Sequence, residues 1–236
     1  MSSSASDSPR WKPLDVRQRR VLGVMIEKAK TTPAGYPISV NAIVTGCNQK
    51  SNRDPLSEYD DTDVEQALDQ LRLMGVVQEI DWLGRVCKYK HLAYEWMGVD
   101  KTELAVLAEL LLRGAQSLGD LRARASRMEP IEDVNALKVI IDRLVERGLM
   151  LELTPSGRGQ IVSHALYPAT EREQVLAQAA GGQVVHAVSS GGDALPETAR
   201  VGPRAADAEV HTLRAEIVDL RARIEALEAR LALAGG

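Results

Sequence analysis

The feature that most constrains the fold of this chain is an internal repeat. The stretch "LDVRQRRVLGVMIEK" (residues 14–28) aligns with "VDKTELAVLAELLLR" (residues 99–113). Each copy begins with an Asp that is followed three residues later by Gln or Glu, which is the capping-box pattern of a helix start. Apolar residues at helical spacing follow in both copies. A chain that carries one helical unit twice is expected to contain two copies of one supersecondary structure.

A second pair of segments repeats further along the chain. "VEQALDQLRLMGVV" (residues 64–77) aligns with "LKVIIDRLVERGLM" (residues 137–150), and each predicts a helix that ends at a glycine, Gly75 or Gly148. Two short apolar runs around a glycine-containing turn come after each glycine and predict a β-hairpin. A shorter helix, "SVNAIVTGC" in one copy and "SLGDLRARASR" in the other, is expected between the two long ones.

Three helices followed by a hairpin form the winged-helix arrangement. We therefore expect an α+β fold, mainly α with small β-hairpins, in which two winged-helix domains follow one another. The expected boundaries are a disordered N-terminus over residues 1–13, winged-helix domains over 14–97 and 98–170, a flexible linker over 171–207 and a coiled-coil helix over 208–234. The linker is rich in Gly, Ala, Ser and Pro and shows no usable period.

The last segment carries an apolar seam with alternating spacings of three and four residues, which is the heptad pattern of a coiled coil. The residues expected to form the seam are Val210, Leu213, Ile217, Leu220, Ile224, Leu227 and Leu231. Charges on the flanking positions are opposite in sign for a parallel pair of helices, so we expect a homodimer. An antiparallel pair, or a helix that packs on its own chain, remains open.

Composition and motifs exclude several classes of function. A net charge of −4 leaves room only for a local nucleic-acid surface. Two cysteines, Cys47 and Cys87, are too few for a disulfide framework or a cysteine-based zinc module and fit a reducing cytoplasm. There is no long apolar segment, no metal-ligand spacing among the histidines and no phosphate-binding motif. We expect a cytoplasmic, non-enzymatic protein without cofactor, metal or membrane association.

The winged-helix hypothesis makes duplex DNA the first candidate partner, by analogy at the level of the fold. The third helix of the first copy is nevertheless acidic, and carboxylates repel phosphates. The candidate nucleic-acid or partner-binding residues therefore come from the loop before that helix, from the two hairpins and from the end of the second copy's short helix. They are Asn48, Gln49, Lys50, Asn52, Arg53, Arg85, Lys88, Lys90, Arg122, Arg124, Arg127 and Arg158.

The stretches "EKAKTTPAGYPISVNAIVTGCNQKSNRDP" and "LLLRGAQSLGDLRARASRM" resemble the bacterial YceH family over about residues 14–167. The resemblance implies two winged-helix domains and a short heptad helix at the end. It places a family signature on Tyr36, Pro37, Ser39, Asn41, Cys47, Asn48, Gln49, Lys50, Asn52 and Arg53. The second hairpin departs from the family, which tends to have a longer basic strand there.

Two hypotheses about function remain. In the first, the chain is a dimeric DNA-binding regulator of transcription, which the basic hairpins and the expected two-fold symmetry favour. In the second, it is a protein-interaction scaffold of the kind found in ScpB-type chromosome-segregation proteins, which the acidic third helix and the negative net charge favour.

Overall fold

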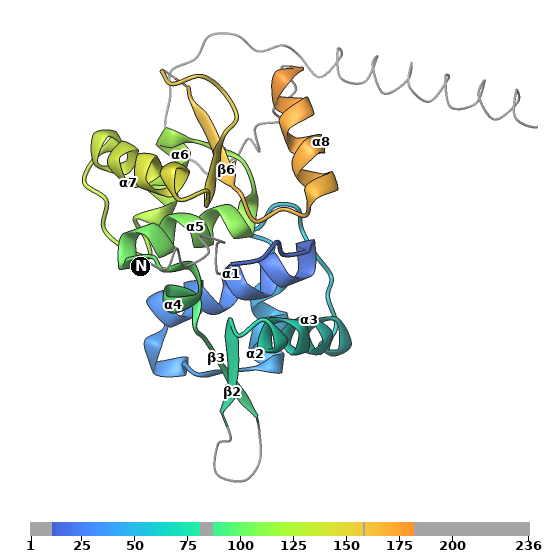
Figure 1. The fold of residues 1–236 in the computed structure, drawn as a ribbon. Helices are drawn as coiled ribbons and strands as arrows, with labels where there is room; N and C mark the ends of the chain where they lie inside the picture. Colours follow the sequence, from blue (N-terminus) through green and yellow to red (C-terminus); the bar gives the residue numbers. More distant parts are fainter. Residues whose placement is uncertain (1–10, 81–86, 158, 182–236) are drawn as a thin grey trace, which may run out of the picture. The chain divides into compact units, whose positions relative to one another are not determined.

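The computed structural model describes residues 11–80, 87–157 and 159–181. The fold is mixed α+β. The described residues form eight α-helices, one short 3₁₀ helix and two small antiparallel sheets of three strands each (Figure 1). No helix in this part of the chain combines the length and the apolar character needed to cross a membrane.

The first repeat consists of α1 (Val16–Thr31), η1 (Pro33–Gly35), β1 (Ile38–Ser39), α2 (Val40–Cys47), α3 (Asp61–Leu73), β2 (Val77–Ile80) and β3 (Lys88–His91). The expected capping box of α1 is confirmed. The Asp15 side chain accepts from the backbone N–H of Gln18, and the Gln18 side chain accepts from the backbone N–H of Asp15. The expected glycine after α3 is confirmed as well, because Gly75 has a φ of 74°.

The second repeat consists of α5 (Lys101–Arg113), β4 (Gln116–Ser117), α6 (Leu118–Ala125), α7 (Val134–Glu146), β5 (Met150–Glu152) and β6 (Ile161–His164). Its capping box at Asp100 and its glycine at Gly148 (φ 68°) also agree with the sequence pattern. The short helix α4 (Ala93–Met97) connects the two repeats and was not expected.

A final helix, α8 (Ala169–Ala180), replaces the first ten residues of the expected linker. Its alanine- and glutamine-rich sequence has a high helix propensity, and Glu171 anchors it to α1 through an ion pair with Arg19. Val175 also packs against the small apolar cluster of Leu151, Ala165 and Tyr167. The low apolar content of this segment suggested a linker, whereas its helix formers and these contacts favour a helix.

Both sheets have the same topology. The strand orders are β1-β3-β2 and β4-β6-β5, so the second strand of each hairpin is central and the first strand lies at an edge. In the first sheet Tyr89 of β3 pairs with Ile38 of β1 on one side and with Glu79 of β2 on the other. The short strands β1 and β4 were not expected, because two residues are too few to show a period in the sequence.

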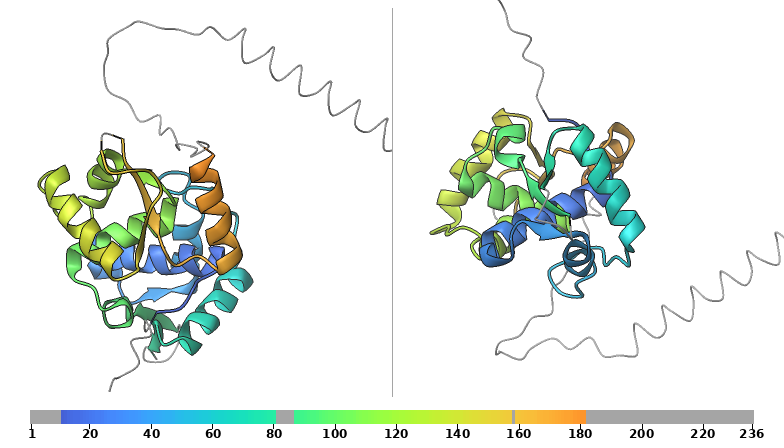
Figure 2. Two further views of the ribbon diagram at one scale, coloured as in Figure 1. Left: turned by 45° about the horizontal axis from the view of Figure 1, so that its top comes forward. Right: turned by 90° about the horizontal axis from the view of Figure 1, so that it is seen from below.

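The two repeats share one hydrophobic core. Helix α1 packs along α5, a pairing that Figure 1 shows and that Figure 2 shows from two further directions. Gly23 of α1 permits the close approach, because a Cβ atom there would lie 3.0 Å from Cγ and Cδ2 of Leu112. The buried apolar residues of both copies form one continuous cluster. The repeat boundary near residue 97 is therefore not a boundary between two cores.

Candidate functional site

The polar loop between α2 and α3 is held by its own side chains. Asn48 follows the last residue of α2, its Nδ2 donates to the carbonyl oxygen of Tyr59 at 2.7 Å, and its Oδ1 accepts from the backbone N–H of Tyr59 at 2.8 Å. The amide of Asn48 thus pins the end of the loop to its beginning. Among the loop's candidate residues, Lys50 is exposed to solvent.

Arg53 is placed differently from the sequence-based expectation of a contact surface. It is 5% exposed and forms a two-pronged ion pair with Glu27 of α1, in which Nη2 lies 2.6 Å from Oε2 and Nη1 lies 3.3 Å from Oε1. Its Nε donates to the carbonyl oxygen of Gly46 at 2.8 Å, and Gln49 Oε1 accepts from its Nη2 at 3.0 Å. The guanidinium is therefore a brace inside the protein. Glu27 lies on α1, 26 residues earlier in the sequence, so no local pattern indicated this pairing.

The loop is also linked to the second repeat. Asn52, which has a φ of 61°, accepts through Oδ1 from Nη2 of Arg113 at 2.6 Å. Nε of Arg113 lies 3.1 Å from Oε1 of Glu109, and Nη2 of Arg127 lies 3.5 Å from the other carboxylate oxygen of Glu109. Candidate residues from the two repeats, far apart in sequence, thus meet at one network. Its central members, Arg113 and Glu109, were missed in the sequence.

The buried carboxylate explains why this network exists. Glu109 is fully buried, and burial raises its pKa, while Arg113, Arg127 and Arg124 oppose that effect. A charge in the interior is stable only when it is paired. The single Glu inside the apolar run "LAVLAELLL" was the signal that could have identified this site from the sequence.

The other described basic candidates of the second repeat, Arg122 and Arg124, bind residues within that repeat. Nε of Arg122 donates to the carbonyl oxygen of Ile131 at 3.0 Å and Nη2 donates to that of Glu132, which fixes the loop between α6 and α7. Nη1 of Arg124 donates to Oε1 of Gln116 at 2.6 Å. Both side chains are half-buried, so they present less charge to a partner than the sequence suggested.

The first hairpin carries its lysines on one face. Lys88 and Lys90 alternate with Tyr89 along β3, so their side chains leave the sheet on the face opposite to the buried Tyr89 ring. The residues paired with them on β2 are Ile80 and Gln78. Arg85, Arg158 and the whole heptad seam lie outside the described residues, so their roles stay predictions.

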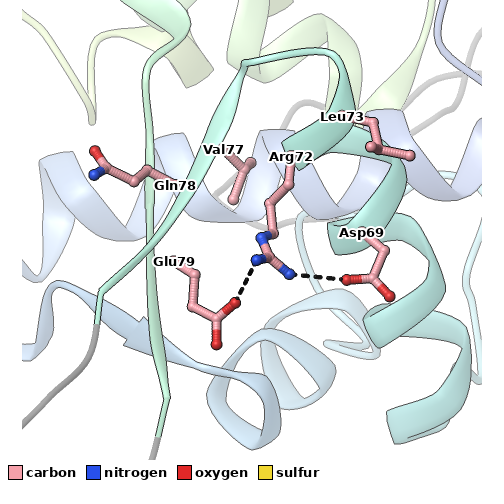
Figure 3. A pocket seen from close by; sticks show the side chains of 6 residues that line it. All are labelled: Asp69, Arg72, Leu73, Val77, Gln78 and Glu79. Atoms are coloured by element: carbon pink, nitrogen blue, oxygen red, sulfur yellow. Dashed lines mark hydrogen bonds and ion pairs between the residues drawn. The ribbon is translucent and has the colours of Figure 1, made fainter.

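A pocket of about 620 Å³ opens between helix α3 and strand β2. Figure 3 shows Arg72 reaching from α3 between two carboxylates. Its Nη2 lies 2.7 Å from Oε2 of Glu79, and its Nη1 lies 3.1 Å from Oδ1 of Asp69. Leu73, at the rim, is 89% exposed. The pocket therefore combines an excess of negative charge with an exposed apolar side chain.

The backbone next to this pocket is also open. Strand β2 is an edge strand, and in the described part of the chain it pairs only with β3. An edge strand presents unpaired N–H and C=O groups along its free side. No three His, Cys, Asp or Glu side chains come together as a metal site anywhere in residues 11–80, 87–157 and 159–181. The pocket and the free edge of β2 thus lie side by side on one surface, formed by α3 and β2.

Comparison with known proteins gives the family of the chain. The family model described as "Protein of unknown function, DUF480" matches residues 14–158. A UPF0502 protein of Rhodopirellula baltica is 52% identical over 171 residues, which are 72% of each chain. A UPF0502 protein of Pelobacter propionicus is 49% identical over 57% of this chain and 62% of its own length. One of Koribacter versatilis is 39% identical over 76% of this chain and 84% of its own length.

These findings correct the family assignment made from the sequence motifs. The resemblance to the YceH family was wrong as a name, because the matching family model and the relatives carry the names DUF480 and UPF0502. The region that carries the motifs, however, is the region that the family model matches. The chain belongs to the UPF0502 family, and most of the two-repeat unit described above lies within the matched residues 14–158.

Proposed function

We propose that this chain is a non-enzymatic tandem winged-helix protein that binds another protein through the α3–β2 surface, formed by Asp69, Arg72, Leu73 and residues 77–79. Three helices followed by a hairpin occur twice in the same order, and each sheet has a short third strand. This arrangement supports the winged-helix assignment. The heptad seam beyond the described residues fits a homodimer, and the low cysteine content of the chain fits a reducing cytoplasm.

One observation carries this proposal, which is the charge on the outer face of α3. In DNA-binding winged helices the third helix enters the major groove. Here the exposed side chains of α3 include Asp61, Glu65 and Asp69, and its one arginine, Arg72, is held by two carboxylates. A phosphate backbone would be repelled from this face. A protein segment with positive charge would be attracted to it.

The same surface indicates the chemistry of the partner. The free edge of β2 suits an extended segment that adds a strand by backbone hydrogen bonds. Glu79 and Asp69 suit a Lys or Arg side chain of that segment, and Leu73 suits an apolar one. We therefore propose an extended, basic segment of a partner protein as the ligand of this surface.

Site-specific photo-crosslinking tests the proposal. A photoreactive residue placed at Gln78 in the full chain should cross-link to a partner polypeptide in cells of the source organism. The charge reversal Asp69→Arg should abolish the product, because it replaces attraction by repulsion. Asp142→Arg is the matched control, since Asp142 is exposed at the equivalent position of α7. A cross-link that is insensitive to Asp69→Arg, or equally sensitive to Asp142→Arg, would contradict the assignment.

Duplex DNA is the second candidate partner, and the lysine face of the first hairpin favours it. Lys88 and Lys90 project from the same side of β3, and the described strand residues on that face include no carboxylate. Contact through the hairpin would leave the acidic α3 away from the phosphates. Fluorescence anisotropy with a labelled duplex across a salt series tests this candidate. Affinity that falls steeply with salt and is lost in Lys88→Glu/Lys90→Glu would replace the protein-binding proposal by DNA binding.

A further inference from the structure

A second pocket lies at the junction of the two repeats, away from the α3–β2 surface. It has a volume of about 320 Å³, and we call it the junction pocket. Its walls come from α1, the loop after residue 53, the C-terminal end of α5 and the segment from β6 to α8. The lining residues that bear on its chemistry are Arg19, Arg20, Arg113, Leu110, His164 and Tyr167.

Arg20 is a buried cation without a carboxylate partner. It is 4% exposed, and the described residues give it no ion pair, although Asp54 also lines the pocket. Its Nη2 donates to the carbonyl oxygen of Pro55 at 2.6 Å, and its Nη1 donates to that of Cys47 at 3.2 Å and to Oγ of Ser57 at 3.4 Å. These acceptors are neutral. Burial, followed by repulsion from Arg53, lowers the pKa of Arg20, as expected for an uncompensated charge.

A buried donor beside the same pocket lacks a hydrogen-bond partner. Nε of Arg20 is buried and has no hydrogen-bond partner. Nε of Arg113 is also without one, although it lies 3.1 Å from a carboxylate oxygen of Glu109. A buried N–H group that makes no hydrogen bond destabilises the folded chain. Arg113 Nε has the Glu109 carboxylate beside it, so the buried Nε of Arg20 is the donor of this pocket for which an acceptor is missing.

The other two arginines of the pocket are ion-paired, Arg113 with Glu109 and Arg19 with Glu171. Arg19 is held by Glu171 of α8, with Nη1 2.9 Å from Oε2, and its guanidinium lies 4.8 Å from the centre of the Tyr167 ring. Burial keeps the pKa of His164 well below its ordinary value, so this imidazole is neutral near pH 7. Its Nδ1 accepts from the backbone N–H of Leu166 at 3.2 Å, which leaves the proton on Nε2. Of the three arginines that line the pocket, Arg20 is the one to which the described residues give no ion pair, and Asp54 offsets its charge only in part.

We propose that the junction pocket binds a small organic anion, with a carboxylate or phosphate head beside Arg20 and Arg113 and an apolar body against Leu110 and Tyr167. Interior charges in proteins are normally paired, and the acceptor that would pair Arg20 is absent from the described residues. The volume lies at the lower end of the range for small-molecule sites. This proposal does not depend on the α3–β2 surface.

Two probes distinguish the possible head groups in a calorimetric titration of the full chain. Benzoate supplies a carboxylate with an apolar ring, and inorganic phosphate supplies a dianion without an apolar body. Saturable binding of either probe at millimolar concentration is expected. Tighter binding of benzoate assigns a carboxylate ligand, and tighter binding of phosphate assigns a phosphate ester. Absence of saturable binding by both probes would overturn the proposal.

Variants connect the binding to Arg20. Arg20→Gln should weaken the preferred probe by about tenfold or more, because it removes the charge-assisted hydrogen bond. Arg17→Gln is the matched control. It removes the same charge from the same helix, but Arg17 is ion-paired with Asp63 and does not line the pocket. Equal affinity in Arg20→Gln and wild type would refute the assignment.

A second pair of variants covers the case in which Arg20→Gln does not fold. Val16 lines the rim of the pocket and is 50% exposed, so its replacement removes little buried surface. Val16→Glu should weaken the probe about threefold and Val16→Lys should strengthen it about threefold, as expected for one charge near the bound anion in a largely aqueous setting. Shifts in the same direction for both variants, or none, would count against an anion in this pocket.

Discussion

Two buried arginines of the first repeat, Arg20 and Arg53, have different roles, and the presence of a carboxylate partner decides which. Arg53 and Arg20 are both almost completely buried, yet Arg53 is matched by Glu27, whereas Arg20 donates only to neutral acceptors. The run of polar residues around Arg53 suggested an exposed contact surface. Only the packing of α2 against α1 brings Glu27 within reach, and that packing cannot be read from local sequence.

Loss of the Arg53–Glu27 pair should destabilise the fold strongly. Arg53→Gln leaves the Glu27 carboxylate buried without its cation, which costs about 3 kcal/mol or more in the free energy of unfolding. The control Arg72→Gln breaks ion pairs at a site where the arginine side chain is 42% exposed, so a loss below about 1 kcal/mol is expected. Urea denaturation of both variants measures the difference. Similar losses would show that Arg53 is not a brace.

His91 should make the stability depend on pH. Burial, with a further contribution from Lys30, lowers its pKa from 6.5 to about 4 in the folded chain. The unfolded chain therefore binds the proton more readily between these values. The free energy of unfolding should fall as the pH drops from about 6.5 to about 4. His91→Gln should reduce the loss measured by urea denaturation at pH 7 and pH 5. An unchanged difference would mean that His91 is not responsible.

At the scale of the elements, the sequence predicted what depends on local pattern. The long helices, their capping boxes and the two glycines at positive φ follow from residues a few positions apart, as at Asp15 and Gly75. The strands β1 and β4, the helix α8 and the network at Glu109 depend on partners that are distant in sequence. Local periodicity carries no information about such partners, so these features were missed.

Replacement by alanine should lower the free energy of unfolding at Gly75 and raise it at Gly119, although both positions have room for a Cβ atom. Gly75 has a φ of 74° after α3, and Gly119 lies within α6; a Cβ atom at either would meet nothing within 4 Å. Gly75→Ala should cost on the order of 1 kcal/mol through backbone strain alone. Gly119→Ala should add about 0.5–1 kcal/mol, because alanine favours the helix. Thermal unfolding followed by circular dichroism measures the change in stability of each variant. A change in the same direction for both variants would contradict the backbone assignment of Gly75.

At the scale of the molecule, the repeat in the sequence suggests two domains, whereas the packing joins them. The apolar faces of α1 and α5 are buried against each other, and the side chains from Leu104 to Leu112 include several that are fully inaccessible to solvent. The Asn52–Arg113 contact also crosses between the copies, and the Arg19–Glu171 ion pair ties the first copy to α8. An isolated repeat would expose the face that its neighbour covers, and large exposed apolar patches are rare in stable single domains.

The two repeats should therefore unfold as one cooperative unit. Urea denaturation of the full chain is expected to give one transition, with the same midpoint by tryptophan fluorescence and by far-ultraviolet circular dichroism. Trp96 of α4 lies between the repeats in sequence and reports on their junction.

A fragment covering residues 98–181 should lack a cooperative transition, because α5 loses the cover of α1. The sharper test is Gly23→Val in the full chain, which crowds Leu112 at the shared interface and should lower the midpoint seen by both probes equally. Two separate midpoints, or a fragment that folds cooperatively by itself, would show that each repeat is an independent domain.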